Sequence, residues 1–577
     1  MTQLRPILLL AIAASLALAL PLAAEKGAPA PKSCDTAGLA LPPGFCATIF
    51  ADKLGHARHL AVAADGTVYV NAWSSPYDKN RPAPEAGFLV ALRDRDGDGR
   101  ADEVGRFGET AAEGGRGGTG IGLFEGALYA EINDRIVRYG LKDGELTPSS
   151  APEVVMSGLP LEGDHPMHPF AIGPDGGLFV NLGSATNACE EHNRMPGSPG
   201  REPCDELLTR GGLWRYDARA TGQTFSSAER YATGLRNAEG LAFDSAGRFF
   251  ATQHGRDQLA ENWPKLFTPE QGRELPAEEL VKVTKGADFG WPRCYFDPTL
   301  GRFVLAPEYG GDGEKAGLCA DKTPPVAAFP AHWAPNDLTI YEGTSFPDAY
   351  KGGAFIAFHG SWNRAPGPQE GYAVVFQPLK DGKSAGGYVL FADGFAGAHK
   401  EPGRAEHRPS GLAVGPDGAL YVSDDQRGRI WKIVYAGERD AGLAPAATGA
   451  GLASNASAQG LDEAALPVHA GSTREEVSRG ARIFRGEVGK ATCGGCHGSD
   501  GKGSPIGPDL TSGRWLWSDG SLQGITRTIE AGVPRPREHG GAMPPMGGVA
   551  LSPNDLRAVA SFAWSLGHAR EAADGEK

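Results

Sequence analysis

A short phrase that recurs six times along the chain is the feature that most restricts its fold. In each copy a polar turn ending in Gly precedes a strand of aromatic and β-branched residues, and the copies occupy residues 64–70, 125–130, 173–180, 245–251, 351–357 and 415–422. An Asp-Gly pair between strand-like segments is typical of a tight hairpin turn that needs positive φ. The copies lie roughly 50–75 residues apart, with one wider gap, which suits four-stranded blades with insertions. The repeats predict an all-β six-bladed β-propeller over residues 35–440, and another all-β fold with ordinary hairpins is the alternative.

Composition agrees with this prediction and limits the classes of molecule that the protein is expected to bind. The 577 residues include 83 Gly and 44 Pro, which favour turns and strands over long helices. The formal net charge is −14, and no basic cluster indicates a nucleic acid or an anionic membrane as a partner. A chain of this length should hold more than one domain.

The most informative chemical motif of the sequence lies C-terminal to the last repeat. Residues 491–497 contain the pattern Cys-x-x-Cys-His, in which Cys493 and Cys496 can each add to one haem vinyl group. His497 would then lie under the iron as its proximal ligand. A thiol–disulfide or zinc Cys-x-x-Cys that happens to precede a His is the alternative. The flanking sequence favours haem c.

Those flanks predict a small all-α domain over residues 472–572. Thr473 and Glu476 form a capping box at the start of one helix, and Ser552-Pro553 begins the last one. Gly480 and Phe484 share a face on which two helices can cross closely. With the loop 506–510 and a Met-Pro turn in the same order, this segment resembles a class I cytochrome c.

The resemblance implies a Met as the sixth iron ligand, because a soft thioether raises the potential of an electron acceptor. Met543 precedes Pro and matches the cytochrome pattern, whereas Met546 is expected to pack against the haem edge. His539 and His568 are weaker candidates for this ligand.

The N-terminus and the remaining cysteines indicate an exported protein. Residues 1–24 combine Arg5, an apolar run and a small-residue cleavage site, as in a signal peptide; a retained membrane anchor is the alternative. The six other cysteines fall into the sequence-local pairs Cys34–Cys46, Cys189–Cys204 and Cys294–Cys319. Free buried thiols would be the other interpretation. We therefore expect a periplasmic protein without stable membrane insertion, with a flexible linker over residues 441–471.

Several phrases in the propeller segment resemble the soluble quinoprotein glucose and sorbosone dehydrogenases. The most specific are Leu-Arg-Asn-x-x-Gly-Leu at 235–241 and Gly-x-x-Phe-Gly-Trp-Pro at 286–292. Further phrases follow in the family's order at 163–165, 253–257, 359–364 and 407–413. The resemblance covers nearly the whole propeller. It implies pyrroloquinoline quinone (PQQ) and Ca²⁺ as cofactors of a dehydrogenase.

The resemblance also implies the site residues. His165 is the expected general base, oriented or tuned by Asp164, with His168 as a rival three residues on. PQQ is a tricarboxylate, so guanidinium groups are suited to bind it. The residues expected at PQQ are Arg236, which also belongs to the catalytic set, Asn237, His359, Arg364 and Arg408.

Two positions are candidates for Ca²⁺. The backbone oxygens of Gly255 and Arg256 match the family's site at the quinone, although the glucose enzymes have Gly-Pro there. The family's cofactor-binding Lys and the Gln of blade one have no clear counterpart in this chain. Separately, Asp94, Asp96 and Asp98 begin a loop like that of a structural calcium site, but Gly105 stands where a bidentate Glu is needed. A solvated hairpin tip is the alternative for that loop.

Together these observations favour a periplasmic quinohaemoprotein dehydrogenase. It would oxidise a sugar, namely an aldose, a sorbosone-like compound or another polyol or aldehyde, and pass electrons through haem c. The external acceptor would be a cytochrome or a membrane quinone oxidoreductase. A calcium-dependent lactonase-type hydrolase is a second hypothesis, although it leaves the haem unexplained. A non-catalytic electron-transfer or binding protein is a third.

Overall fold

The computed structural model describes residues 35–74, 84–365, 367–443, 465–485, 488, 491, 493–498, 501–503, 507–539 and 542–574. The predicted signal peptide, Cys34 and most of the predicted linker lie outside these residues. Within them, no helix is both long and apolar enough to cross a membrane.

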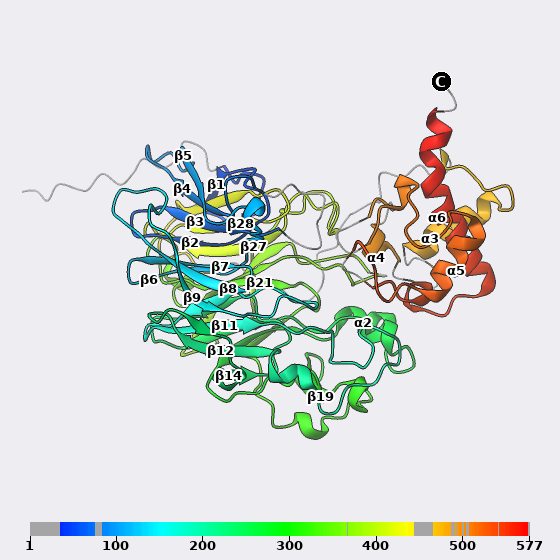
Figure 1. The fold of residues 1–577 in the computed structure, drawn as a ribbon, viewed down its shortest axis with the longest axis horizontal. Coiled ribbons are helices and arrows are strands. Elements are labelled where there is room, and N and C mark those ends of the chain that lie inside the picture. Colours follow the sequence, from blue (N-terminus) through cyan, green and yellow to red (C-terminus); the bar gives the residue numbers. More distant parts are fainter. Residues whose placement is uncertain are drawn as a thin grey trace, which may run out of the picture. The chain divides into compact units, whose positions relative to one another are not determined.

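Six antiparallel sheets form the predicted six-bladed propeller, and Figure 1 labels many of their strands. Blade 1 consists of β2 (Ala57–Val62), β3 (Val68–Ala72), β4 (Leu89–Arg93) and β5 (Glu103–Phe107). Blade 2 consists of β6 (Ile121–Phe124), β7 (Ala127–Ile132), β8 (Arg135–Gly140) and β9 (Glu153–Ser157), with β13 (Gln223–Thr224) added in parallel. Blade 3 consists of β10 (Phe170–Ile172), β11 (Gly177–Leu182), β12 (Gly212–Asp217) and β14 (Arg230–Thr233).

The second half of the ring repeats the pattern with one large insertion. Blade 4 consists of β15 (Leu241–Phe243), β16 (Phe249–Gln253), β17 (Glu278–Val283) and β20 (Ala327–Phe329). Its insertions are α1 (Leu259–Asn262), α2 (Pro269–Glu274), β18 (Cys294–Asp297) and β19 (Arg302–Leu305). Blade 5 consists of β21 (Pro335–Ile340), β22 (Ala354–Phe358), β23 (Ala373–Gln377) and β26 (Val389–Ala392), and the small hairpin β24 (Leu379–Lys380) and β25 (Lys383–Ser384) branches from it. Blade 6 consists of β27 (Pro409–Val414), β28 (Leu420–Asp424), β29 (Ile430–Tyr435) and β1 (Phe45–Ala51).

Each recurring phrase corresponds to the turn between the first and second strands of a blade, followed by the second strand. In blade 1, Gly66 adopts φ of 85° between β2 and β3, which explains the glycine at the end of the turn. Second strands are buried on both faces, so each begins with consecutive apolar residues, and the polar residues stand toward its C-terminal end. In β16, for example, Phe249 packs toward blade 3 while its neighbour Phe250 packs toward blade 5.

The ring closes in a way that the sequence repeats did not predict. The N-terminal strand β1 pairs antiparallel with β29, with Phe45 opposite Tyr435, and so supplies the outermost strand of blade 6. A chain-ordered prediction would have placed four consecutive strands in this blade. Because β1 completes blade 6, the ring is closed, and each pair of neighbouring blades shares its own apolar cluster.

The C-terminal domain is helical, as predicted. Its helices are α3 (Arg474–Phe484), α4 (Cys493–His497), α5 (Leu522–Ala531) and α6 (Pro553–Asp574). The capping box at Thr473 and Glu476 is present, and Ser552 accepts a hydrogen bond from the Asp555 amide at the start of α6. The two terminal helices cross at Gly480, where a Cβ atom would lie 2.0 Å from the carbonyl oxygen of Ala558.

Replacement of Gly480 tests this crossing. We expect Gly480→Ala to destabilise the C-terminal domain by about 1–3 kcal/mol, because the added methyl group must push α3 and α6 apart. Thermal unfolding of the full chain, followed at the haem absorbance, measures the change. Gly471→Ala is the matched control, since its added Cβ would lie 3.4 Å from the nearest atom. Equal midpoints for the two variants would contradict the close crossing.

Candidate functional sites

A polar cavity lies in the propeller at the open ends of the first hairpins. It is lined by residues just before first strands, namely His56, His165, Asn237, Ala334 and Arg408, and by residues just after second strands, namely Trp73, His254, His359 and Asp425. Five of the six blades contribute. The recurring turns lie at the closed ends of the same hairpins. The cavity is therefore about one strand length away from the turns that the sequence repeats identify.

His165 lines this cavity with a defined protonation state. Its Nδ1 lies 3.0 Å from both the carbonyl oxygen and the hydroxyl of Ser184. A carbonyl only accepts, so Nδ1 carries the proton and Nε2 is the basic nitrogen. Burial and the nearby Arg236 guanidinium hold the pKa of His165 well below its ordinary value of 6.5. The ring is therefore neutral at physiological pH and able to accept a proton at Nε2.

Asp164 lies beside His165 in the cavity wall, but the carboxylate is engaged elsewhere. It accepts hydrogen bonds from Arg194 at 2.9 Å and from Asn193 at 3.2 Å. Arg194 also pairs with Asp257, whose pKa is lowered by Arg236 and Arg194 despite the opposing effect of burial. Ser184 therefore orients the imidazole at Nδ1, in the role that was predicted for Asp164.

Arg236 and Asn237 are both buried in the cavity wall and form hydrogen bonds within the described part of the protein that leave some of their N–H groups unused. The Arg236 guanidinium donates to the carbonyls of Asn187 and Gly255 and pairs with Asp257 at 2.8 Å. Asn237 donates to Glu239 and accepts from Asn181. These contacts hold both side chains in one geometry beside the cavity.

Arg408 differs from the other cavity arginines in its partners. It donates to the carbonyl oxygens of His359 and Gly360 at 3.0 Å, and no carboxylate of the described residues lies within ion-pair distance. Its charge is thus available to an anionic ligand. Burial and this guanidinium lower the pKa of His359 to about 3, so that ring is neutral where it contacts Asp425.

Two predicted residues do not line this cavity. Arg364 is buried against the carbonyl oxygens of Arg273 and Ala331 and pairs with Glu274 and Glu370. The Arg256 side chain pairs with the buried Glu308. The prediction for Arg256 concerned its backbone oxygen, which this side-chain contact does not test. The Arg364 side chain is long enough to turn to either side of its backbone, so the motif alone could not settle its direction.

The fit of Ca²⁺ at Gly255 is only partial. The Gly255 carbonyl accepts Nη1 of Arg236 at 2.8 Å, and its amide donates to Glu278. A carbonyl keeps a second lone pair, but Ca²⁺ takes six to eight oxygens and would lie beside a guanidinium here. The described residues form no preassembled cage around Gly255, and any ion would take most of its ligands from a bound molecule and water.

The separate acidic loop brings together a different set from the predicted one. Ligand atoms of Asp94, Asp96 and Asp102 lie within 4.8 Å of one another, whereas Asp98 is not in the group. All three carboxylates accept backbone amides of the same loop. Such bonds are those of a hairpin tip that is held by its own side chains.

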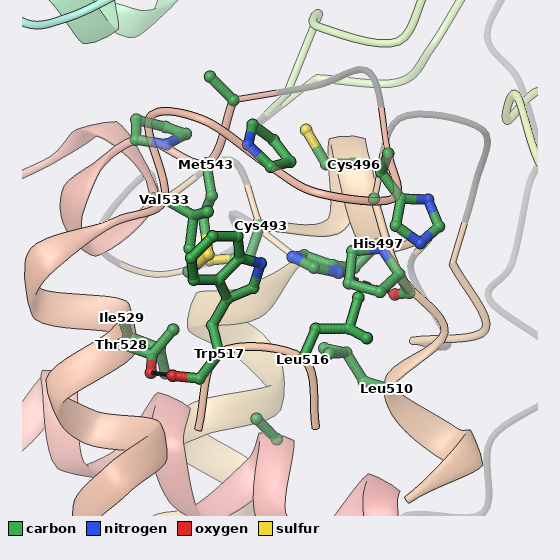
Figure 2. A pocket seen from close by; sticks show the side chains of 18 of the residues that line it. Cys493, Cys496, His497, Leu510, Leu516, Trp517, Thr528, Ile529, Val533 and Met543 are labelled. Atoms are coloured by element: carbon green, nitrogen blue, oxygen red, sulfur yellow. Dashed lines mark hydrogen bonds between the residues drawn. The ribbon is translucent and has the colours of Figure 1, made fainter. Parts of the chain in front are cut away.

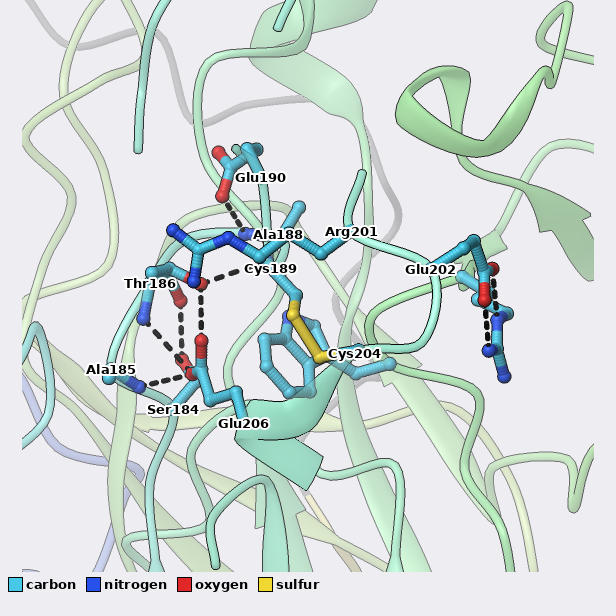
Figure 3. Close-up of a disulfide and its surroundings, with 12 residues drawn as sticks. Ser184, Ala185, Thr186, Ala188, Cys189, Glu190, Arg201, Glu202, Cys204 and Glu206 are labelled. Atoms are coloured by element: carbon cyan, nitrogen blue, oxygen red, sulfur yellow. Dashed lines mark hydrogen bonds and ion pairs between the residues drawn. A yellow bond between two sulfur atoms is a disulfide. The ribbon is translucent and has the colours of Figure 1, made fainter. Parts of the chain in front are cut away.

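Two of the three predicted disulfides are present in the described residues. Cys189–Cys204 and Cys294–Cys319 close loops with sequence separations of 15 and 25 residues. Figure 3 shows the first of these among hydrogen bonds of residues 184–206. The third pair includes Cys34, which lies outside the described residues.

In the C-terminal domain, Cys493, Cys496 and His497 line an apolar crevice (Figure 2). Nδ1 of His497 lies 3.0 Å from the carbonyl oxygen of Pro508, which confirms that the loop 506–510 supports this His; Ile506 itself is outside the described residues. Because that carbonyl only accepts, Nε2 is the nitrogen left for a metal. The crevice therefore fits a haem attached through the two thiols.

Met543 lines the same crevice (Figure 2). Its amide and carbonyl pair with Val533 at 2.9 and 2.8 Å, which fixes the backbone that carries the thioether. Met546 packs on the apolar core of the domain and is not among the lining residues. Of the two histidines considered as iron ligands, His539 lines the crevice, whereas His568 stacks on Trp564 away from it.

Comparison with known proteins assigns both parts of the chain. The sequence profile of the TrAA12-like family matches residues 39–436. The chain belongs to the TrAA12-like family. The cytochrome c profile matches residues 477–567, so the TrAA12-like propeller is followed by a cytochrome c domain that carries haem c.

Similar proteins cover the propeller. A calcium structure of a Trichoderma reesei carbohydrate-active enzyme of family AA12 has a TM-score of 0.54 at 18% identity, over 70% of this chain and 98% of that one. The holo form of the pyranose dehydrogenase PQQ domain from Coprinopsis cinerea has a TM-score of 0.53 at 19% identity, over 71% and 99%. The curated PQQ-dependent pyranose dehydrogenase of Coprinopsis cinerea is 28% identical over 239 residues, which are 35% of this chain and 30% of that protein. This TrAA12-like chain spans between 30% and 49% of the length of the first curated relatives.

Sequence reasoning missed several cavity residues of the TrAA12-like propeller. Asp425, Arg58 and Glu239 form a buried group in which Arg58 pairs with both carboxylates at 2.8 and 2.6 Å. Asp425 directly follows the second strand of its blade. The position directly after each recurring strand was therefore the sequence signal that could have identified this residue. Arg194 carried no such signal, because it lies in an insertion.

Substitution of Met543 tests the iron ligand of the cytochrome c domain. We expect Met543→Ala to lower the midpoint potential of the haem by on the order of 0.1 V, because loss of the thioether removes the ligand that favours the reduced iron. Spectroelectrochemical titration of the holoprotein measures this shift. Met546→Leu should leave the potential near that of the wild type. A large shift for Met546→Leu alone would assign the ligand to Met546.

Proposed function

We propose that this chain is a periplasmic quinohaemoprotein dehydrogenase that oxidises a sugar with PQQ and passes the electrons through its haem c to an external acceptor. The observation that carries the proposal is a neutral, oriented His165 in a polar cavity of a chain that also holds a one-electron carrier. The substrate would be an aldose, a sorbosone-like sugar or another polyol or aldehyde. A hydrolase would leave the cytochrome c domain without a role.

The cavity residues support binding of an anionic cofactor. Arg408 offers a cationic group without a carboxylate partner, and Arg236 and Asn237 are held rigidly beside it. PQQ, when bound, supplies the acceptor for two electrons. We assign Arg408 and Arg236 to its carboxylates, Asn237 and His359 to its polar edge, and the free lone pair of the Gly255 carbonyl to Ca²⁺. The curated relative from Coprinopsis cinerea is named for PQQ, which agrees with this assignment.

His165 performs the proton transfer in this proposal. Its Nε2 takes the proton from the substrate hydroxyl as the carbon is oxidised, while Nδ1 keeps its own proton in the hydrogen bond to Ser184. Burial and the Arg236 guanidinium keep the imidazole unprotonated before the reaction, because both lower the pKa of His165.

Export to the periplasm accounts for the other features. Two disulfides persist in an oxidising compartment, the motif at residues 493–497 suits attachment of haem c, and residues 1–24 have the pattern of a signal peptide. The external acceptor would be a cytochrome or a membrane quinone oxidoreductase.

Reconstitution of the full chain is the direct experiment. With PQQ and Ca²⁺, a panel of sugars should reduce the haem, which is followed by its absorbance. A chain that ends at residue 443 should still reduce a dye with the same sugars, because every residue assigned above to the cofactor and the proton transfer lies in the propeller. The proposal fails if no sugar, polyol or aldehyde reduces the haem or the dye in the presence of both cofactors.

Replacement of the base gives a second test. His165→Asn should lower kcat for dye reduction by about 100-fold or more, because an amide can still donate to Ser184 but cannot accept the proton. In the wild type, the rate should stay level above pH 6.5 and fall only at lower pH, since the pKa of His165 is held well below 6.5. Steady-state assays over a pH series measure both effects. His192→Asn, at an exposed position of the insertion that follows β11, should be as active as the wild type.

A further inference from the structure

The orientation of His165 depends on a segment that is itself held from outside the cavity. Residues 184–186 follow β11, and Ser184 supplies both acceptors of Nδ1. The Ser184 hydroxyl donates its own proton to the carbonyl of Thr186 at 2.6 Å, which leaves its lone pairs for the imidazole. The geometry of this short segment therefore decides where the imidazole lies.

One carboxylate holds that segment. Oε1 of Glu206 accepts the amides of Ala185 and Thr186, the latter at 3.1 Å, and Oε2 accepts the Thr186 hydroxyl at 2.7 Å. Figure 3 shows the Glu206 side chain against these groups. Three hydrogen bonds to one ionised group make a strong local restraint, because charged acceptors bind more tightly than neutral ones.

Glu206 is fixed in turn by the disulfide. It lies on the 3₁₀ turn Asp205–Leu208, which begins directly after Cys204. Cys204 is bonded to Cys189, and the Cys189 amide donates to the hydroxyl of Thr186 at 2.9 Å. The disulfide thus joins the turn that carries Glu206 to the segment that Glu206 binds (Figure 3).

A second side chain from the same insertion holds the other side of His165. The buried Arg210 donates to the carbonyl of Gly183 at 3.2 Å and also contacts the carbonyls of Glu162 and His165. Its backbone amide donates to the carbonyl of Glu206 at 2.9 Å. Glu206 therefore holds residues 185–186, and Arg210 holds the carbonyl groups of residues 162, 165 and 183. Together they fix the two segments that meet at His165.

We propose that Glu206 is a positioning residue for His165, acting through Ser184 and anchored by the Cys189–Cys204 disulfide. This inference rests on the proposed function, in which His165 is the base. Glu206 is not among the residues that line the cavity, so its effect should fall on the rate of proton transfer and on the pKa of His165 rather than on substrate affinity.

The test compares Glu206→Gln with Glu202→Gln. Glu202 lies in the same disulfide loop but forms an exposed pair with Arg293, so its loss perturbs the loop surface without touching residues 184–186 (Figure 3). In Glu206→Gln the amide oxygen can still accept the amides of Ala185 and Thr186, but an NH2 group replaces the acceptor of the Thr186 hydroxyl and the negative charge is lost. We expect kcat to fall by about tenfold with KM within about twofold of the wild type, since small displacements of a reacting group are costly. Glu202→Gln should match the wild type in both.

A readout independent of turnover is the titration of His165 in the PQQ-free protein. Its imidazole NMR signals are assigned with His165→Asn. In Glu206→Gln the pKa of His165 should rise toward 6.5, because a loosened segment admits water, and the acidic limb of the kcat profile should move to higher pH with it. A purely structural role would lower the unfolding temperature and leave both curves in place.

The outcomes separate this inference from the proposed function. An unchanged titration and kcat in a folded Glu206→Gln protein would overturn the positioning role. If the wild type oxidises no substrate, the proposed function fails, and the NMR comparison alone decides whether Glu206 holds His165. Should Glu206→Gln not fold, Thr186→Val removes one of the three hydrogen bonds to Glu206, together with the bond from the Cys189 amide, and should shift the titration in the same direction by a smaller amount.

Discussion

The structure depends on the burial of both faces of every blade. A second strand such as β16 sends alternate side chains into two different apolar clusters, so no blade has a complete core by itself. Six such interfaces require a closed ring, and the pairing of β1 with β29 completes the last blade. The side chains at the open ends of the hairpins then meet around one cavity. The cavity therefore forms only when the ring is closed.

The cavity satisfies a second constraint, because charges removed from water must be paired. Arg58, Arg194 and Arg236 each contact at least one carboxylate, whereas Arg408 is bonded to carbonyl oxygens. Buried carboxyls follow the same logic: burial raises the pKa of Glu278 to about 8, although it accepts the amides of Gly255 and Ala334. A site built in this way is rigid before a cofactor arrives.

Sequence reasoning predicted the blades and the cytochrome c domain because both depend on local patterns. The turn at Gly66 and the capping box at Thr473 are encoded within a few residues. The role of β1 could not be found in this way, because its partner lies almost 400 residues away in the chain. The same holds for side-chain directions: the motif around Arg364 suggested the cavity, but Glu274 and the carbonyl oxygens of Arg273 and Ala331, which belong to other segments, hold the side chain away from it.

The placement of the cavity residues has a consequence for how such proteins can diversify. Residues such as His254, His359 and Asp425 stand in loops just beyond strand ends, outside the apolar clusters that join the blades. Each of the five contributing blades therefore offers exchangeable positions whose replacement leaves the packing faces intact. A combinatorial library restricted to the residues that flank the first hairpins would sample new ligand chemistries on an unaltered scaffold. By the same reasoning, a duplicated gene could acquire a different substrate through a few loop substitutions while its ring still closed in the original register.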